Sequence, residues 1–532
     1  MAAGHLGPDG TRLQGNALSA TEPSRLPIDP IAVGVFLVMF AAVTILGFFA
    51  ARWRRGDLTQ LHEWGLAGRR FGVAVSWFLI GGDLYTAYTL IAVPAAVFGT
   101  GAPGFFAVPY TIIAYPIMFL VMPRLWCVSE KHGFVTPADF VRARYGSAPL
   151  ALAIAITGIL ATMPYIALQL VGIQVVIAAL GFTGTGLAAD VPLIVAFLIL
   201  AAYTYSSGLR APALIAFVKD AMIYIVILVA IAAIPLRLGG FAHLFTVAQA
   251  HFAATTPPTG SVILAPKAYW SYATLALGSA LALFMYPHAI TGILSASRVD
   301  VVKRNAVLLP AYSLLLGLVA LLGYAAIVAG VHVTKPSDAL PALFAALFPS
   351  WFVGFAFAAI AIGALVPAAI MSIAAANLWT RNIYKAYLKP DATDAEEARS
   401  AKIASLLVKL GALAFIIWVP TQYAINLQLL GGIWMLQTVP AIVVGLYRRW
   451  FHHRALLIGW LAGMLSGTAL SFSQGVKPTL AFTLGTYTIA PYIGLDALVV
   501  NLIVAAALTP VFDRMGAPRH ADSTLAADYA AA

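Results

Sequence analysis

Charged side chains are scarce in this chain, and that scarcity excludes a water-soluble globular domain of ordinary composition. Only 10% of the 532 residues are Asp, Glu, Lys or Arg, whereas 61% are hydrophobic and the mean hydropathy is +0.91. Typical soluble domains carry about 25% charged residues. The apolar residues gather in about thirteen stretches of roughly 20 residues, the length that crosses a bilayer core as a helix. The sequence therefore predicts an all-α integral membrane protein.

Cysteine and the familiar catalytic motifs are lacking as well. Cys127 is the only cysteine, which excludes an intrachain disulfide framework. The chain contains no HExxH zinc helix, no GxSxG nucleophile elbow and no Walker phosphate loop. We therefore expect no enzymatic activity, no direct use of ATP and no catalytic cofactor.

The predicted spans divide the chain into three parts. Residues 1–29 are polar and form an expected extracytoplasmic segment, which lacks the apolar core of a signal peptide. Residues 30–510 form the expected transmembrane domain, and residues 511–532, small and polar, are expected to form a disordered cytoplasmic tail. The spans are predicted to begin near Ile31, Gly72, Gly104, Leu150, Val191, Pro212, Trp270, Ala306, Trp351, Lys402, Ala424, Ala455 and Leu484.

The basic residues are distributed unevenly between the loops on the two sides of the membrane. With the N-terminus placed outside, most of the 31 Lys and Arg residues lie in cytoplasmic loops, as the positive-inside rule requires. An odd number of spans then places the C-terminus inside. The net charge of +11 reflects this topology and contact with anionic lipid, and charges so scattered do not predict nucleic-acid binding. Lys409, near the start of an apolar stretch, is expected to snorkel to the headgroups.

Two of the predicted spans are interrupted by helix-breaking residues. The second reads SWFLIGGDLYTAYTLIAVPAAVF, with a Gly-Gly-Asp run at mid-depth. The seventh reads YATLALGSALALFMYPHAITGIL, with Gly278 early and Pro287 late. If the first span is peripheral, each interrupted helix begins a unit of about five helices, and an odd number of spans per unit gives the two units opposite orientations. Inverted repeats with matching broken helices are typical of transporters. The core is then expected over about residues 72–448.

Five segments, in chain order, resemble the sodium:solute symporter family, and in particular its bacterial monocarboxylate and acetate permease branch. They are GGDLYTAYTLIAVPAAVFGTG, YIALQLVGIQ, YSSGLRAPALIAFVKD, YPHAITGILS and ALVPAAIMSIAAANLWTRNIYK. The resemblance extends from about Leu61 to Thr509. It implies about thirteen transmembrane helices around a LeuT-like core of two inverted five-helix repeats, and secondary uptake of a small organic solute.

Candidate residues for the coupling ion lie on the interrupted second span and on the ninth span. Asp83 is a carboxylate near mid-bilayer, where an ionisable group indicates a functional site. The resemblance implies a Ser/Thr pair that helps to hold sodium, but this chain has Val366 and Pro367 at those positions. A hard cation prefers several oxygen ligands. The coupling cation is therefore H+ or Na+, with H+ favoured; sodium would rely on Asp83, on Ser372 and on backbone carbonyls near Pro367.

Candidate residues for the substrate lie on the interrupted helices and on two neighbouring spans. Thr86 shares a helix face with Asp83, and Gln169 lies in the second matching segment. His288 follows the proline of the second interruption, and its imidazole can bind substrate or carry a proton. Lys219 is predicted either to attract a substrate carboxylate, to form a gating ion pair with Asp220, or to snorkel.

Together these features favour a secondary active symporter for small monocarboxylates such as lactate, pyruvate, acetate or propionate. It would reside in a bacterial cytoplasmic membrane, in contact with lipid, and work by alternating access around the two broken helices. The alternatives are a sodium-coupled symporter for another small solute, such as an amino acid, and a membrane sensor or receptor. A sensor would need a cytoplasmic output domain, and the segment after Thr509 is short for one.

Overall fold

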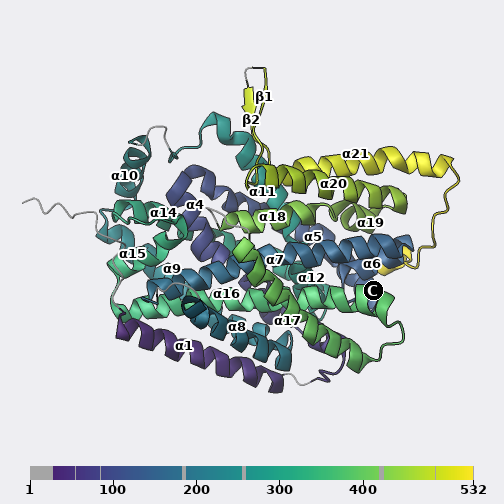
Figure 1. Cartoon of the computed structure of the whole chain (residues 1–532), viewed down its shortest axis with the longest axis horizontal. Helices are drawn as coiled ribbons and strands as arrows, with labels where there is room; N and C mark the ends of the chain where they lie inside the picture. The colour runs from purple at the N-terminus through teal and green to yellow at the C-terminus, as the bar shows by residue number, and fades with distance from the viewer. Residues whose placement is uncertain are drawn as a thin grey trace, which may run out of the picture.

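The computed structural model describes residues 28–53, 56–83, 85–182, 187–254, 259–418, 424–485 and 487–530. Across these residues the chain is a bundle of helices with one small β-hairpin projecting from it (Figure 1). The helices of the first half are α1 (Pro30–Phe49), α2 (Leu61–Leu66), α3 (Val73–Gly82), η3 (Tyr88–Ala92), α4 (Val93–Thr100), α5 (Ala107–His132), α6 (Pro137–Tyr145), α7 (Ala148–Ala179), α8 (Leu187–Ser207), α9 (Arg210–Arg237) and α10 (Phe241–Ala253). Those of the second half are α11 (Tyr269–Leu283), α12 (Pro287–Leu294), α13 (Val299–Leu308), α14 (Pro310–Val328), α15 (Ala339–Leu347), α16 (Ser350–Trp379), α17 (Asp394–Trp418), α18 (Ile425–Leu436), η8 (Pro440–Val444), α19 (Gly445–Tyr447), α20 (His453–Ser473) and α21 (Ile493–Arg514).

Helices occupy the predicted spans, but their number is not confirmed as thirteen. Among the described residues, eight helices are long and apolar enough to cross a membrane, or up to ten if each of two bent pairs counts as one span. Shorter apolar helices lie at the predicted second and fifth spans. These are Val73–Gly82, Tyr88–Thr100 and Val191–Ser207.

Burial separates a central helix from peripheral ones. The most apolar part of the α16 span is 94% buried, whereas the corresponding part of the α1 span is 17% buried. Helix α16 packs against α7, α1, α17 and α9, and α1 lies along one edge of the bundle while α20 and α21 lie along the opposite edge (Figure 1). Because both helices are apolar on all sides, α1 exposes its apolar surface to lipid and α16 buries its own in protein. The first span is therefore peripheral, which is the condition that the repeat argument requires.

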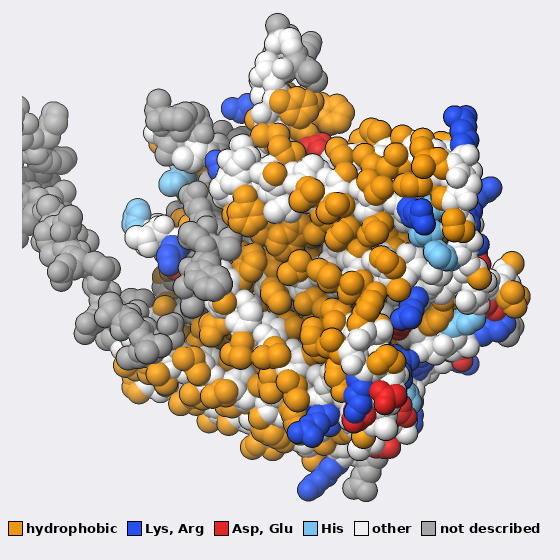
Figure 2. Space-filling view, turned by 45° about the vertical axis from the view of Figure 1, so that its right-hand side comes forward, with side chains coloured by type: hydrophobic (Ala, Val, Ile, Leu, Met, Phe, Trp, Pro, Cys, Tyr) orange, Lys and Arg blue, Asp and Glu red, His pale blue; other side chains and the backbone are white. Residues whose placement is uncertain are grey.

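The surface shows the same division between apolar and charged residues. The middle of the face in Figure 2 is largely hydrophobic, and the Lys and Arg side chains gather along its right-hand edge. Large apolar side chains on the outer helices are exposed, such as Leu465 of α20 (63% exposed) and Ile503 of α21 (62% exposed). A soluble protein rarely exposes so continuous an apolar surface, whereas a membrane-embedded one requires it.

The predicted thirteenth span begins later than expected. Residues Phe482–Leu484 and Tyr487–Ile489 form two antiparallel strands, β1 and β2, and α21 starts only at Ile493. The alternation of Thr with apolar residues in TLAFTLGTYTIA suits a short hairpin turning at Gly485, whose φ of 63° favours glycine.

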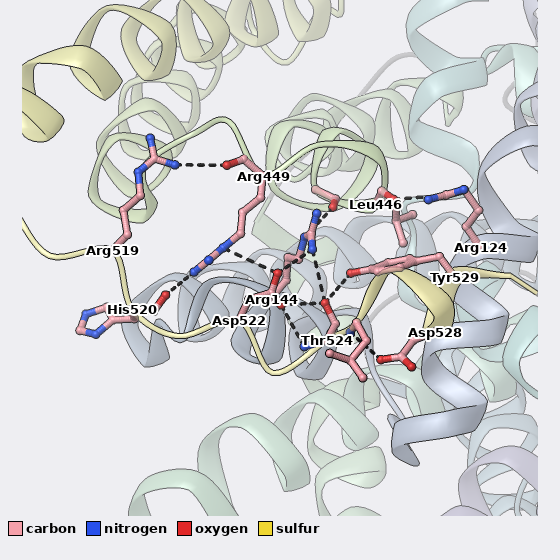
Figure 3. A network of polar contacts seen from close by, with 12 residues as sticks. Arg124, Arg144, Leu446, Arg449, Arg519, His520, Asp522, Thr524, Asp528 and Tyr529 are labelled. Atoms are coloured by element: carbon pink, nitrogen blue, oxygen red, sulfur yellow. Dashed lines mark hydrogen bonds and ion pairs between the residues drawn. The ribbon is translucent and has the colours of Figure 1, made fainter.

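The C-terminal segment, predicted to be disordered, instead packs against the helix ends near α6 (Figure 1). Asp522 pairs with Arg144 at 2.6 Å, and Asp528 pairs with Lys131 at 2.8 Å and with His132 at 2.8 Å. The Tyr529 ring lies under the guanidinium groups of Arg124 and Arg144, and its hydroxyl contacts Thr524 (Figure 3). The composition of this segment does not indicate the packing, because small residues separate the four side chains that make the contacts, Asp522, Thr524, Asp528 and Tyr529. We call residues 519–529 the docked tail.

Candidate functional site

The second predicted span is broken where its Gly-Gly-Asp run ends. Helix α3 stops at Gly82, and helical structure resumes at Tyr88. A break frees backbone groups that need partners in a dry interior. Two predicted site residues supply them: the Gln169 side-chain oxygen accepts from the Ala87 N–H at 3.1 Å, and Thr86 Oγ1 accepts from the Tyr88 N–H at 2.9 Å. Gln169 and Thr86 thus hold the break in its shape.

The two glycines before the break also permit close approach of neighbouring side chains. A methyl group at Gly81 would lie 2.4 Å from the Tyr312 ring. One at Gly82 would lie 3.1 Å from Lys219 Nζ and 3.2 Å from both carboxylate oxygens of Asp220. Any larger residue at Gly81 would therefore displace α14 from α3.

The second break lies between α11 and α12, whose axes are bent by 47°. Tyr286 is extended (φ −60°, ψ 137°), as expected for a residue before proline, and Pro287 starts α12. This geometry places His288 in the first turn of α12, where its Nε2 lies 3.3 Å from Asp83 Oδ2. The two predicted breaks therefore meet, and their two ionisable side chains are in contact.

The Asp83–His288 pair is buried and incompletely bonded. Asp83 is 7% exposed and His288 is 1% exposed. Among the described residues, Asp83 Oδ1 and both ring nitrogens of His288 have no hydrogen-bond partner. The rings of Tyr165 and Tyr286 flank the imidazole with centroids 5.3 Å and 5.2 Å away. Because buried polar atoms are nearly always bonded, these three atoms mark a position for a proton, water or ligand.

Lys219 and Asp220 lie on the other side of the same break. Lys219 Nζ donates to Gly82 O at 2.5 Å and to Tyr85 O at 2.8 Å, and lies 2.8 Å from Asp220 Oδ1. Asp220 Oδ2 accepts from the Tyr312 hydroxyl at 2.9 Å. Both side chains are 0% exposed, so Lys219 does not snorkel. The predicted ion pair of Lys219 with Asp220 is present, because the long lysine side chain folds back onto its neighbour.

The structure places two predicted residues, Ser372 on α16 and Lys409 on α17, away from their expected positions. Ser372 Oγ donates to Ala369 O at 2.8 Å and accepts from Ser405 Oγ at 3.1 Å, so it faces α17 rather than the break. Lys409 does not snorkel: it is 1% exposed, and its Nζ donates to Ser405 Oγ at 3.1 Å. The part of α16 near the break is Gly363, where a methyl group would lie 3.9 Å from Tyr85 O.

Sequence reasoning missed the tyrosines that surround the break. Tyr85 donates through its hydroxyl to Tyr312 O at 2.7 Å, and the two rings are 4.6 Å apart. The hydroxyls of Tyr110 and Tyr115 have no partner among the described residues, and both rings line a small cavity with Tyr85 and Tyr312. With 21 tyrosines in the chain, no pattern in the sequence distinguishes these from lipid-facing ones.

The two broken helices are also joined at one end. The Phe71 N–H donates to Ser295 O at 3.1 Å, and the Ser297 N–H donates to Phe71 O at 2.9 Å. Arg69 adds hydrogen bonds to Leu294 O at 3.2 Å and to Phe134 O at 2.5 Å. The start of α3 and the end of α12 therefore behave as one unit. Among the described residues no group of three or more His, Cys, Asp or Glu side chains could hold a metal ion.

Comparison with known proteins gives this arrangement a context. Residues 64–467 match the model of the sodium:solute symporter family. A Rhizobium johnstonii protein named monocarboxylate transport permease is 56% identical over 90% of this chain and 96% of its own length. The uncharacterized symporter YodF of Bacillus subtilis is 35% identical over 90% of this chain and 93% of its own length.

A solved structure shares the fold. It is a substrate-bound, outward-open Na+-coupled sialic acid symporter, which superposes with a TM-score of 0.72 over 91% of this chain and 98% of that one. The sequences are 16% identical, so the likeness bears on the fold alone. The described helices therefore form a LeuT-like core of inverted repeats, as predicted.

Proposed function

Because the chain belongs to the sodium:solute symporter family, we propose that it takes up small monocarboxylates together with protons rather than sodium. Membership makes it a multi-pass secondary active transporter of a solute and not an enzyme. The substrates proposed are lactate, pyruvate, acetate and propionate.

The observation that carries the proposal is the contact between Asp83 and His288 where the two broken helices meet. Asp83 Oδ1 and both ring nitrogens of His288 have no hydrogen-bond partner among the described residues, and Asp83 Oδ2 lies 3.3 Å from Nε2. A substrate carboxylate at this position would accept from the imidazole and lie near the first turn of α12, whose free N–H groups favour anions. Thr86 and Gln169 hold the first break by bonding its backbone. The Tyr165 and Tyr286 rings beside the imidazole would contact a small apolar group of the substrate and offer no charge for a second carboxylate.

The substrate class has independent support from the relatives. The Rhizobium johnstonii protein is named a monocarboxylate transport permease, and it shares 56% identity with nearly the whole of this chain. We infer the same class of substrate here.

Proton coupling is favoured because α16 contributes no side-chain oxygen ligand for a sodium ion at the break. A hard cation needs several oxygen ligands. Gly363, Val366 and Pro367 on α16 offer no side-chain oxygen, and Ser372 faces α17. Asp83 alternates between a protonated and an ionised form without needing such a cage. In the proposed cycle Asp83 takes a proton from outside and substrate binds beside His288. The proton and the substrate are then released when the site opens inward.

Uptake of labelled pyruvate into proteoliposomes tests this proposal. An inward proton gradient, without sodium, is expected to drive accumulation, and unlabelled lactate, acetate and propionate are expected to compete while glucose does not. A sodium gradient at constant pH is the matched condition and is expected to drive none. Sodium-driven accumulation that survives a protonophore with the membrane potential clamped would contradict proton coupling and favour the alternative, a sodium symporter for another solute such as an amino acid. Absence of any competition by monocarboxylates would contradict the substrate class.

We also propose that the protein resides in a bacterial cytoplasmic membrane with its N-terminus outside and its C-terminus inside, in contact with lipid. The gathering of Lys and Arg at one edge of the molecule supports a cytoplasmic side there (Figure 2). Residues 30–510 would then form the transmembrane domain, with residues 1–29 outside. A reporter that is active only in the cytoplasm is expected to work when fused to the C-terminus and to be inactive when fused to the N-terminus. Activity of the N-terminal fusion would contradict the topology.

A further inference from the structure

The side chain of Lys219 occupies a position that a free cation could otherwise occupy. Its ammonium group lies between two backbone carbonyl oxygens of the first break, Gly82 O at 2.5 Å and Tyr85 O at 2.8 Å. The carboxylate of Asp220 completes the group at 2.8 Å. All of these atoms belong to buried residues, and the lysine comes from α9 rather than from the broken helix itself.

The chemistry of this cluster is that of a site for a monovalent cation. Carbonyl oxygens released by a helix break point at a single centre, and one carboxylate supplies the negative charge that a cation requires. Gly82 has no side chain to obstruct the centre, since a methyl group there would lie 3.1 Å from Lys219 Nζ. On α16, a methyl group at Gly363 would lie 3.9 Å from Tyr85 O and 3.2 Å from the Ile223 side chain, so α16 also approaches this carbonyl closely.

We infer that Lys219 is a tethered cation: its ammonium fills a carbonyl-lined cation site at the first break, so that no mobile sodium binds there. The inference rests on the proton-coupled symport proposed above and deepens it, because it explains how the transporter keeps this site charged without carrying an ion across. The role of Lys219 is then to hold the break and to balance Asp220, and the substrate carboxylate is left to His288. Lys219 is a positioning residue in this scheme.

Removal of the lysine should convert the site into one that binds sodium. In Lys219→Ala, the two carbonyls and the Asp220 carboxylate remain around an empty centre. A ligand that binds only the folded state raises its stability by mass action. We expect sodium chloride, compared with choline chloride at equal ionic strength, to raise the melting temperature of purified Lys219→Ala by on the order of 3 °C. The wild-type protein should melt at the same temperature in both salts.

Lys409→Ala is the matched control, because it removes another buried lysine that contacts Ser405 rather than the break. It should show no sodium-specific shift. A wild-type protein that sodium stabilises, or a folded Lys219→Ala that sodium does not, would overturn the inference. If Lys219→Ala does not fold in choline, Lys219→Ser is measured by the same criterion; if neither folds in either salt, the sodium response of the wild type decides.

The melting experiment is independent of the transport assay. If pyruvate is not carried but Lys219→Ala responds to sodium, the substrate proposal fails and the tethered cation stands. If wild-type pyruvate uptake is proton-driven but Lys219→Ala gives no sodium response, the tethered cation fails and the proposed function stands.

Discussion

Asp83 and Asp220 are both buried carboxylates at the first helix break, but their surroundings differ. Asp220 has a lysine at 2.8 Å and a tyrosine hydroxyl at 2.9 Å, one for each oxygen. Asp83 has one imidazole at 3.3 Å, and its other oxygen has no partner among the described residues. Each oxygen of Asp220 therefore has a close polar neighbour, an ammonium or a hydroxyl, whereas one oxygen of Asp83 has none among the described residues.

The difference teaches which carboxylate can take part in a transport cycle. A buried charge whose bonds are all made is costly to disturb, because removal of one partner leaves the other uncompensated. A buried group with an open bond can gain and lose a proton or a ligand without disrupting its neighbours. We assign the exchangeable proton to Asp83 and a structural charge balance to Asp220.

The largest effect on transport is expected from Asp83→Asn. The amide mimics the protonated acid but cannot release a proton, so substrate should still bind and exchange across the membrane. Accumulation against a gradient should fall to the equilibrium level, while counterflow of labelled pyruvate in preloaded proteoliposomes persists. Glu396→Gln, which changes a half-exposed carboxylate paired with Lys389 in the first turn of α17, is the control and should accumulate pyruvate as wild type does. Concentrative uptake by Asp83→Asn would show that the exchangeable proton lies elsewhere.

The next largest effect is expected on stability, from Asp220→Asn. This change leaves the Lys219 ammonium buried without its carboxylate, which typically costs about 3–5 kcal/mol. The melting temperature should fall and little folded protein should be recovered. Because the loss comes from the unpaired lysine, the double variant Lys219→Met with Asp220→Asn should recover much of it. A double variant no more stable than Asp220→Asn would break the comparison, since Asp220 would then matter for reasons other than its charge.

A smaller effect is expected from Tyr312→Phe. The change removes one hydrogen bond to the Asp220 carboxylate and leaves the ring, which packs against the Tyr85 ring. Loss of a hydrogen bond to a charged group costs about 1.5–3 kcal/mol. Denaturation of purified protein should show that loss, with proton-driven uptake retained. Tyr324→Phe, whose hydroxyl has no partner among the described residues, should be near neutral.

The sequence predicted the backbone of this site better than its side-chain partners. Gly-Gly-Asp and Pro287 identified both breaks, because glycine and proline act locally on the helix. The contact of Asp83 with His288 joins spans far apart in the chain, and nothing local specifies it. Lys219 was judged from its depth along α9, whereas its partners are carbonyls of another helix. Ser372 lies about two and a half turns beyond Gly363, on the opposite side of α16. Whether Ser372 faces the break depends on which side of α16 packs against it, and the sequence does not specify that side.

The docked tail extends the comparison to a carboxylate outside the membrane-spanning helices. Asp528 has a close partner for each oxygen, as Asp220 has, but these partners are Lys131, the Leu525 N–H and His132. These contacts hold the pKa of Asp528 below its ordinary value, so its stabilisation of docking is complete above about pH 4 and is lost as the pH falls through the lowered pKa. Because salt screens such exposed pairs, the effect should be the smallest of the four.

Asp528→Asn at pH 7 reproduces the neutral state of that carboxyl without exposing the protein to acid. A fluorophore attached at the C-terminus should show lower anisotropy in this variant than in wild type, with pyruvate uptake unchanged. Asp300→Asn, which removes an exposed carboxylate in the first turn of α13, should leave the anisotropy as it is. High salt should release the wild-type tail in the same direction, since Arg144 with Asp522 and Lys131 with Asp528 are both screened. A tail that stays docked in Asp528→Asn and in high salt would mean that Tyr529, packed on Arg124 and Arg144, anchors it without the carboxylates.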